Sequence, residues 1–209
     1  MKIIGKLLSI FKKDSMVEKL YKIGAYHEAG HAVLGFYSGF EVKSISLITS
    51  DPGSGITRFD YGADNLLIAG ILNAKKDPAF FNSLSQPVRA RTPQACLKIC
   101  NTLIAGPVTE AIYKFGIDYI GNMEVGIKDP DAEGIEAADY VLSIIDKNHS
   151  KAYIQETIIS ITEILRSEQF WTVVISLSDK LLNSKAKTLA RQEIEAVFEK
   201  HNFTQYDRL

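Results

Sequence analysis

The feature that most restricts the fold of this chain is a pair of histidines four residues apart within a segment of helical periodicity. His27, Glu28 and His31 form an H-E-x-x-H motif. Apolar residues recur around it at the spacing of a helix, which predicts a helix over residues 17–38. Side chains four residues apart share one face of a helix, so both imidazoles can reach the same metal ion. The motif therefore predicts a helix that carries two ligands of a metal site.

The residue types of the motif indicate zinc-dependent hydrolysis. Glu28 lies one residue after the first histidine, about 100° around the helix, where it can contact a metal-bound water without being a ligand. Zinc lowers the pKa of such a water toward neutrality. Glu28 would then accept its proton, and the hydroxide would attack a polarised carbonyl. We therefore expect Zn²⁺ as the cofactor, His27 and His31 as ligands and Glu28 as the general base.

A third ligand must come from another part of the chain, because a catalytic zinc has three protein ligands and one open position. Asp131 is the best candidate. It begins a predicted helix and lies on the helix face that must turn inward, where an unpaired carboxylate is costly. The competing interpretation is an ordinary helix N-cap at Asp129 or Asp131. Asp129, Glu110 and Glu133 are the alternative ligands.

The remaining pattern predicts a mainly α (α+β) fold with one small β-hairpin beside the first helix. Residues 41–48 and 56–61 read as strands joined by a D-P-G-S-G turn. Residues 77–93 are polar and contain three prolines, so we expect a long exposed loop there, a candidate lid. Further helices are expected at residues 65–74, 94–115, 131–146, 150–166, 168–182 and 188–201, the last three forming a C-terminal helical bundle.

Residues 1–16 form a separate amphipathic N-terminal segment. Its apolar residues fall on one side of a helix and its lysines on or near the other, which is the pattern of a helix at a membrane surface. Residues 1–13 would make that peripheral membrane contact. A helix docked on its own domain or on a partner has the same pattern, and we favour that interpretation. The segment has neither a spanning apolar run nor a signal-peptide cleavage site, so we expect a cytoplasmic location.

Charge and cysteine content narrow the function classes. The chain has 24 Lys plus Arg and 25 Asp plus Glu, whereas a nucleic-acid-binding protein normally has a basic excess. We therefore expect no nucleic-acid partner. Cys96 and Cys100 lie one helical turn apart, a poor spacing for a disulfide, and are expected to be core residues. The absence of a disulfide framework suits a reducing compartment.

Residues 25–33, A-Y-H-E-A-G-H-A-V, resemble the active helix of the FtsH-type ATP-dependent zinc peptidases. Residues 42–47 followed by 55–57 resemble the strand pair after that helix. Residues 103–112 resemble the L-x-G-G-R-x-A-E-E segment of that family, and residues 171–198 its C-terminal bundle. The resemblance implies a single zincin-like peptidase domain over residues 17–209 and an endopeptidase acting on unfolded or flexible protein substrates.

In that family the third zinc ligand is an Asp that opens a helix, and Asp131 is the matching position. The sequence departs from the family pattern nearby, with Pro130 in place of Asn before the Asp and Pro107 in place of the Arg of the G-G-R segment. Ile135 and Glu136 replace the Ala-Thr pair that follows.

Family members also carry transmembrane helices and an AAA ATPase module, whereas this sequence has no G-x-x-x-x-G-K-[ST] loop. We therefore expect a peptidase domain standing alone, with no ATP as partner. The family forms rings, which suggests a homo-oligomer. The alternative function is a catalytically silent metal-binding scaffold or interaction protein of the same fold. The intact Glu28 favours the enzyme, because a scaffold has no use for a general base.

Overall fold

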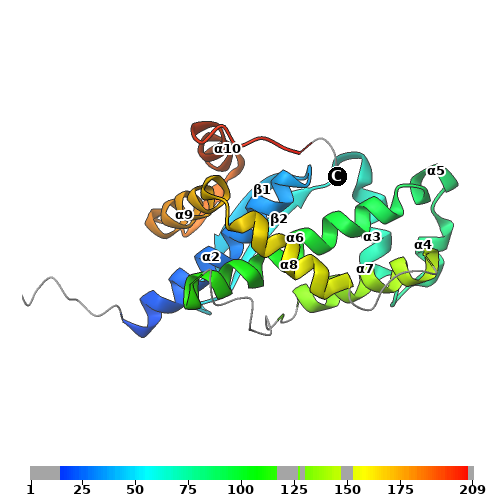
Figure 1. Ribbon diagram of the computed structural model, residues 1–209, viewed down its shortest axis with the longest axis horizontal. Helices are drawn as coiled ribbons and strands as arrows, with labels where there is room; N and C mark the ends of the chain where they lie inside the picture. The colour runs from blue at the N-terminus through cyan, green and yellow to red at the C-terminus, as the bar shows by residue number, and fades with distance from the viewer. Residues whose placement is uncertain (1–14, 117–126, 128–129, 147–152, 207–209) are drawn as a thin grey trace, which may run out of the picture.

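A computed structural model describes residues 15–116, 127, 130–146 and 153–206 of the chain (Figure 1). Within these residues the fold is mainly α, with one small antiparallel sheet, as the sequence predicts. The predicted amphipathic helix at residues 1–13 lies outside the described residues. Among the helices described, none combines the length and the apolar character needed to cross a lipid bilayer.

The motif lies on α2 (Met16–Tyr37), whose start is fixed by a capping box. Ser15 accepts a hydrogen bond from the backbone N–H of Glu18, and the Glu18 carboxylate accepts one from the N–H of Ser15. Two residues beyond the helix, Gly39 has a φ of +93°, a conformation that stops helical continuation. The middle of α2, around the motif, is buried on nearly every side. Other elements must therefore pack around α2 throughout the site.

The second long helix, α6 (Thr92–Phe115), packs along α2 and is the centre of the fold. A Cβ on Gly30 of α2 would lie 2.7 Å from the carbonyl oxygen of Ala105 and 2.4 Å from the hydroxyl of Thr109, both on α6. Only a residue without a side chain permits this approach. The two helices are thus in close backbone contact beside the motif.

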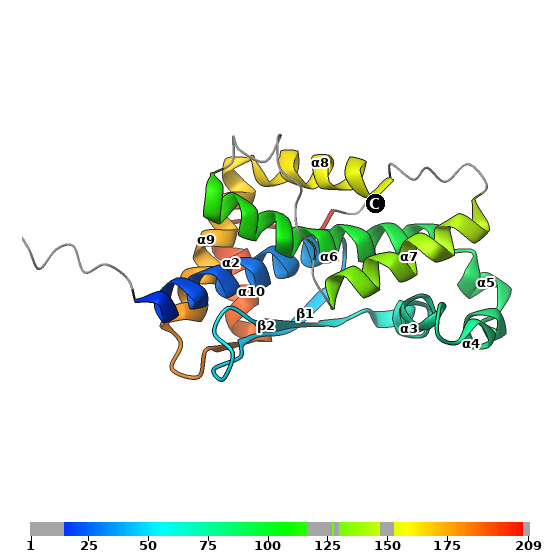
Figure 2. The same ribbon diagram turned by 90° about the horizontal axis from the view of Figure 1, so that it is seen from below.

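The sheet has the order β2-β1-β3 and lies on one side of the α2–α6 pair (Figure 2). Strands β1 (Glu41–Leu47) and β2 (Gly55–Asp60) form the predicted antiparallel hairpin. The third strand, β3 (Thr188–Ala190), pairs antiparallel with β1. The sequence pattern predicts a helix over residues 188–201, and for these three residues that prediction is wrong. A three-residue strand is too short to show the alternation that identifies strands in a sequence.

Short helices occupy the region expected to be a loop. Residues 77–93 contain α4 (Pro78–Ser83), α5 (Gln86–Arg89) and the start of α6. Each of the three prolines lies in the first turn of its helix, where a missing N–H costs nothing. The buried side chain of Phe81 anchors α4, which packs on the neighbouring helix α3 (Asn65–Asn73). The prediction of a long exposed loop is therefore wrong, and the interpretation as a lid loses its basis.

The remaining helices surround α6 and α2. α7 (Asp131–Ile145) lies along α6, and α8 (Tyr153–Leu165) packs on the side of α6 away from the sheet (Figure 2). α9 (Glu168–Asn183) packs on α2, and α10 (Arg191–Lys200) contacts α9 and the sheet. Cys96 and Cys100 are buried core residues without a disulfide, as predicted. This arrangement brings the start of α7 to the face of α2 that carries the motif.

Candidate metal centre

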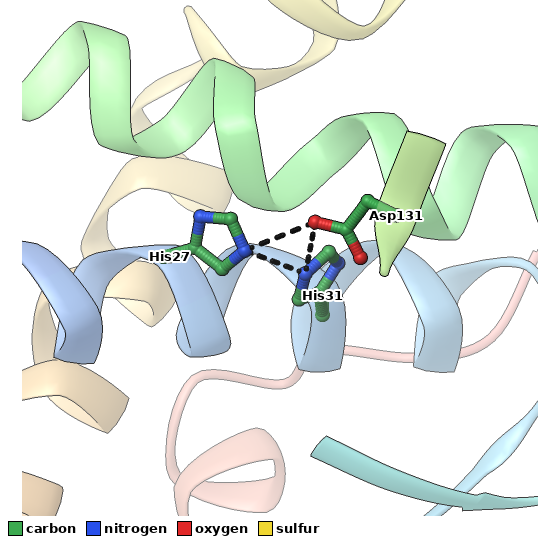
Figure 3. Close-up of side chains that lie close together, drawn as sticks. All are labelled: His27, His31 and Asp131. Carbon is green, nitrogen blue, oxygen red and sulfur yellow. Dashed lines mark hydrogen bonds and ion pairs between the residues drawn. The ribbon is translucent and has the colours of Figure 1, made fainter. Parts of the chain in front are cut away.

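Three potential metal ligands converge where the start of α7 meets α2 (Figure 3). The Nε2 atoms of His27 and His31 are 3.0 Å apart. One oxygen of Asp131, Oδ2, lies 3.2 Å from Nε2 of His27 and 3.4 Å from Nε2 of His31. The helical spacing of the two histidines and the first residue of α7 therefore bring together the three ligands expected from the sequence.

The separations of these three atoms fit a tetrahedral zinc ion. Zinc binds imidazole nitrogen and carboxylate oxygen at about 2.0–2.2 Å, so two ligand atoms at tetrahedral angles are about 3.3–3.5 Å apart. The observed 3.0, 3.2 and 3.4 Å approximate one triangular face of such a tetrahedron. A fourth position then remains for water or substrate, as catalytic zinc sites require.

The hydrogen bonds on the far side of each ring also suit a metal site. Nδ1 of His31 donates to the backbone carbonyl of Thr102 at 2.8 Å, and Nδ1 of His27 donates to a carboxylate oxygen of Glu110 at 3.0 Å. With a proton on each Nδ1, both Nε2 atoms can turn a lone pair toward the Asp131 oxygen, as ligands of a metal ion must. Three such acceptors side by side favour a shared positive charge, which a proton on His27 or a bound metal ion can supply.

The electrostatics of the site favour a cation at this point. Burial lowers the pKa of His27, but its hydrogen bonds with Asp131 and Glu110 outweigh that effect and raise the pKa to about 9. For Asp131, burial raises the pKa, but hydrogen bonds with His27 and His31 outweigh it and hold the pKa well below its usual range. The carboxylate is therefore ionised and ready to act as a ligand. Both groups are suited to share a positive charge placed between them.

Glu110 occupies a supporting position rather than that of a third ligand. It accepts hydrogen bonds from Nδ1 of His27 and from the ammonium group of Lys114, one turn further along α6. Burial raises its pKa, but these two bonds outweigh burial and lower the pKa to about 2. A carboxylate behind a ligand histidine fixes the ring orientation and raises its basicity. The structure thus separates Glu110 from the three converging ligand atoms.

Glu133, a further candidate for the third ligand, lies apart from the converging atoms. Its side chain is exposed and forms an ion pair with Lys76 at 3.1 Å, whereas Asp129 lies outside the described residues. Pro130 is the residue at the N-cap position of α7, with no side-chain capping bond, and Asp131 is the first helical residue. The Asp131 side chain points to the histidines instead of capping its own helix.

Glu28 is buried, with 4% of its surface exposed, and is held by the hairpin. The hydroxyl of Thr57 on β2 donates to Oε2 of Glu28 at 2.7 Å and also lies 3.1 Å from the backbone carbonyl of Glu28. At Gly55 of the same strand a Cβ would be 2.5 Å from Cγ of Glu28, so the strand can lie this close only with glycine there. β2 therefore fixes the carboxylate in place.

Sequence reasoning missed three residues that shape the site. Thr57 and Thr102 hold Glu28 and His31 through the bonds described above. Gly106 of α6 makes room for the ligands, because a Cβ there would lie 2.4 Å from Nε2 of His31 and 2.9 Å from Nε2 of His27. All three roles arise from contacts between elements far apart in the sequence. The sequence pointed only to Gly106, because residues 103–112, which contain it, resemble a segment of the FtsH-type peptidases.

A cleft of about 330 Å³ opens onto these groups. His27, Glu28 and Asp131 line it, with Glu110 and Lys114 on the α6 side. The opposite side is formed by the first turns of α2 and by the turn between β1 and β2. Substrate or solvent can thus reach His27, Asp131 and Glu28 from the same side.

Comparison with known proteins does not assign the chain to a family. No protein-family model matches the sequence, and no curated protein sequence matches it. Function must therefore be inferred from the arrangement of the side chains themselves.

Proposed function

We propose that this protein is a zinc-dependent, ATP-independent endopeptidase that hydrolyses peptide bonds of unfolded or flexible proteins. The observation that carries the proposal is the triangle of ligand atoms from His27, His31 and Asp131 at 3.0–3.4 Å. The position of Glu28 supports it further, since its carboxylate faces the same cleft as the ligands. The resemblance of residues 25–33 to the active helix of FtsH-type peptidases points the same way.

Bound zinc would polarise the scissile carbonyl and lower the pKa of the attacking water. Glu28 is the group that accepts the water proton. Its Oε2 receives the hydrogen bond of Thr57, which leaves Oε1 as the atom that takes up the proton and passes it to the leaving amine. Glu110 and the carbonyl of Thr102 keep the imidazoles turned toward Asp131 during this cycle.

The test is the substitution Glu28→Gln in protein purified with its metal. We expect about one zinc per chain in both forms, since Glu28 is not a ligand. Gln is nearly isosteric but cannot accept a proton, so hydrolysis of an unfolded substrate such as casein should fall by a factor of roughly 10² or more. Equal cleavage rates in the two proteins would overturn the proposed role of Glu28.

Zinc binding by the parent protein without any hydrolysis of unfolded substrates would instead support a metal-binding scaffold of the same fold. Asp179→Asn is a suitable control for the substitution. It also neutralises one carboxylate, on α9, and Asp179 is not among the residues that line the cleft.

A further inference from the structure

A partly exposed stripe on α2 leads from the first turn of this helix into the cleft at the metal centre. Four residues follow one another at intervals of four, three and four positions and therefore lie on one face of the helix: Met16, Leu20, Ile23 and His27. The last three line the cleft, and Met16, one turn before them, is 71% exposed. We propose that residues 1–13 of the same chain bind along this stripe and occupy the cleft.

The wall of the cleft opposite the stripe is fixed against α2. The turn between β1 and β2 lies so near α2 that a Cβ on Gly24 would be 3.0 Å from the carbonyl group of Gly53. The hydroxyl of Tyr21 donates a hydrogen bond to the backbone carbonyl of Thr49 at 3.1 Å, at the start of the same turn. Pro52 and Gly53 of this turn line the cleft together with the stripe. The cleft is therefore a preformed groove with an apolar end, ready to receive a helix or an extended chain.

The sequence of residues 1–13 matches a stripe of this kind. Written as a helix, it has five large apolar side chains on one side: Ile3, Ile4, Leu7, Leu8 and Phe11. They recur every three or four residues, which is also the spacing of the apolar residues at the start of α2. Two such stripes can pack against each other, and burial of both removes apolar surface from water.

The length of the connection to α2 suits this placement. Residues 12–14 separate Phe11 from the N-cap Ser15, and antiparallel helices are joined by loops of about two to five residues. From Ser15 to His27 the helix rises about 18 Å, and residues 1–11 in helical form span about 16 Å. The segment is thus long enough to run back from the start of α2 to the metal centre. Because it is tethered there, its effective concentration at the cleft is in the millimolar range.

The charges of the cleft do not oppose the lysines of the segment. Residues 1–13 contain four lysines and no acidic residue. The carboxylates that line the cleft are those of Glu28, Glu110 and Asp131, and the ammonium group of Lys114 is paired with Glu110. With neutral imidazoles, a bound zinc ion would bring the sum of these charges in the cleft to zero. The apolar stripe therefore supplies the attraction in the zinc-loaded protein, and charge adds to it in the metal-free protein.

A segment bound in the cleft would compete with substrate for the same space. The chain would then act as its own competitive inhibitor, which raises the apparent KM and leaves kcat unchanged. This consequence rests on the proposed peptidase function, whereas the binding of residues 1–13 to the cleft does not.

Photo-cross-linking in the full zinc-loaded chain tests the binding. Replacement of Leu7 by p-benzoylphenylalanine should give, on irradiation, a cross-link within one chain to residues 16–23 or 50–55, identified by mass spectrometry after digestion. Its yield should not depend on protein concentration. The same photoreactive group at Tyr206, which is exposed and does not line the cleft, is the control and should not reach these residues. Absence of the cross-link, a cross-link only to a second copy, or one only to lipid when anionic phospholipid vesicles are present overturns the proposal.

A matched pair of variants tests both the packing and its effect on hydrolysis. Leu8→Asp places a carboxylate on the apolar side of the segment and should lower the cross-link yield by about tenfold or more. It should also lower the KM for casein several-fold without changing kcat. Ser9→Asp adds the same charge on the opposite side and should change neither quantity. An active enzyme without the cross-link overturns the docking alone, and a cross-link in protein that hydrolyses nothing overturns the peptidase proposal alone.

Discussion

At the scale of single residues, Asp131 is the residue of the site whose burial most requires a partner, because its side chain is an ionised carboxylate. Its carboxylate, in a residue only 8% exposed, faces two imidazole nitrogens and caps no helix. The sequence predicted that Asp131 would be buried with a partner, because it lies on the inward face of α7, where an unpaired carboxylate is costly. His27, Glu28 and His31 follow from one local motif. The partners Thr57 and Thr102 could not be predicted, since each meets its site residue only through packing between distant segments.

Asp131→Asn tests the role of this carboxylate as a ligand. Asn caps helices as well as Asp does but lacks the negative charge that a zinc ligand supplies. We expect zinc affinity to fall by about tenfold or more, with loss of activity, as measured by competition with a chromogenic chelator. Glu133→Gln is the control, because Glu133 is an exposed carboxylate in the same first turn of α7 that pairs with Lys76. Unchanged zinc affinity in the Asp131→Asn variant would show that Asp131 is not a zinc ligand.

Glu110→Ala tests the support behind His27. Loss of the hydrogen bond to Nδ1 frees the ring and lowers its basicity, so we expect zinc affinity to fall about 10–100-fold while the ion is still bound. Lys114→Met removes the ion pair of Glu110 but keeps its bond to His27, and should have a smaller effect. The same chelator competition measures both. An equal loss of zinc affinity in the two variants would show that zinc binding depends on the ion pair between Glu110 and Lys114 and not on the hydrogen bond between Glu110 and His27.

At the scale of elements, the site depends on how closely α2, α6 and β2 approach one another. Helical periodicity predicted the long helices to within a few residues, because their buried faces are continuous. The prolines at 78, 87 and 93 misled the prediction, since proline breaks a helix interior but begins a helix easily. β3 was missed because Leu189 alone is buried in a three-residue strand. Both errors concern short elements whose structure is determined by packing.

Gly106→Ala tests the close approach of α6 to the ligands. The added methyl would lie 2.4 Å from Nε2 of His31, so a ligand ring or the helix must move. We expect zinc content after purification to fall severalfold, although Ala favours a helix by about 1 kcal/mol over Gly. Gly70→Ala on α3 is the control, because its methyl would come close only to the end of the Leu84 side chain, at 2.9 Å. Full zinc content in Gly106→Ala would mean that the ligands tolerate the displacement.

At the scale of the whole molecule, the proposed metal centre links α2 and α7, two helices that both pack on α6. α7 packs against α6 and α3, while α2 packs against α6, α9 and the sheet. The three ligands bridge α2 and α7 directly. A metal ion bound as proposed would also neutralise the charge of Asp131 between the two imidazoles. Under the proposed function, the stability of the fold should therefore depend on the metal.

Chelation tests this dependence. A ligand present at 1,000 times its Kd stabilises the native state by about 4 kcal/mol, which corresponds to roughly 8–16 °C in Tm for a chain of this size. We expect EDTA to lower Tm by about this amount and added zinc to restore it. In His31→Ala, which lacks one ligand, EDTA should leave Tm unchanged. A Tm of the parent protein that ignores EDTA would contradict a structural contribution of the metal.

The pairing of β3 with β1 has a consequence for the order in which the protein becomes complete during synthesis. Ribosomes release the amino end first, so the hairpin that carries Thr57 emerges long before residues 188–190. A two-stranded hairpin alone is only marginally stable, and this one gains its third strand from a segment more than a hundred residues further along. The support under the general base is thus finished only after all the helices of the site have been made. Under the proposed function, a nascent copy would therefore lack this support for Glu28 until residues 188–190 have been made.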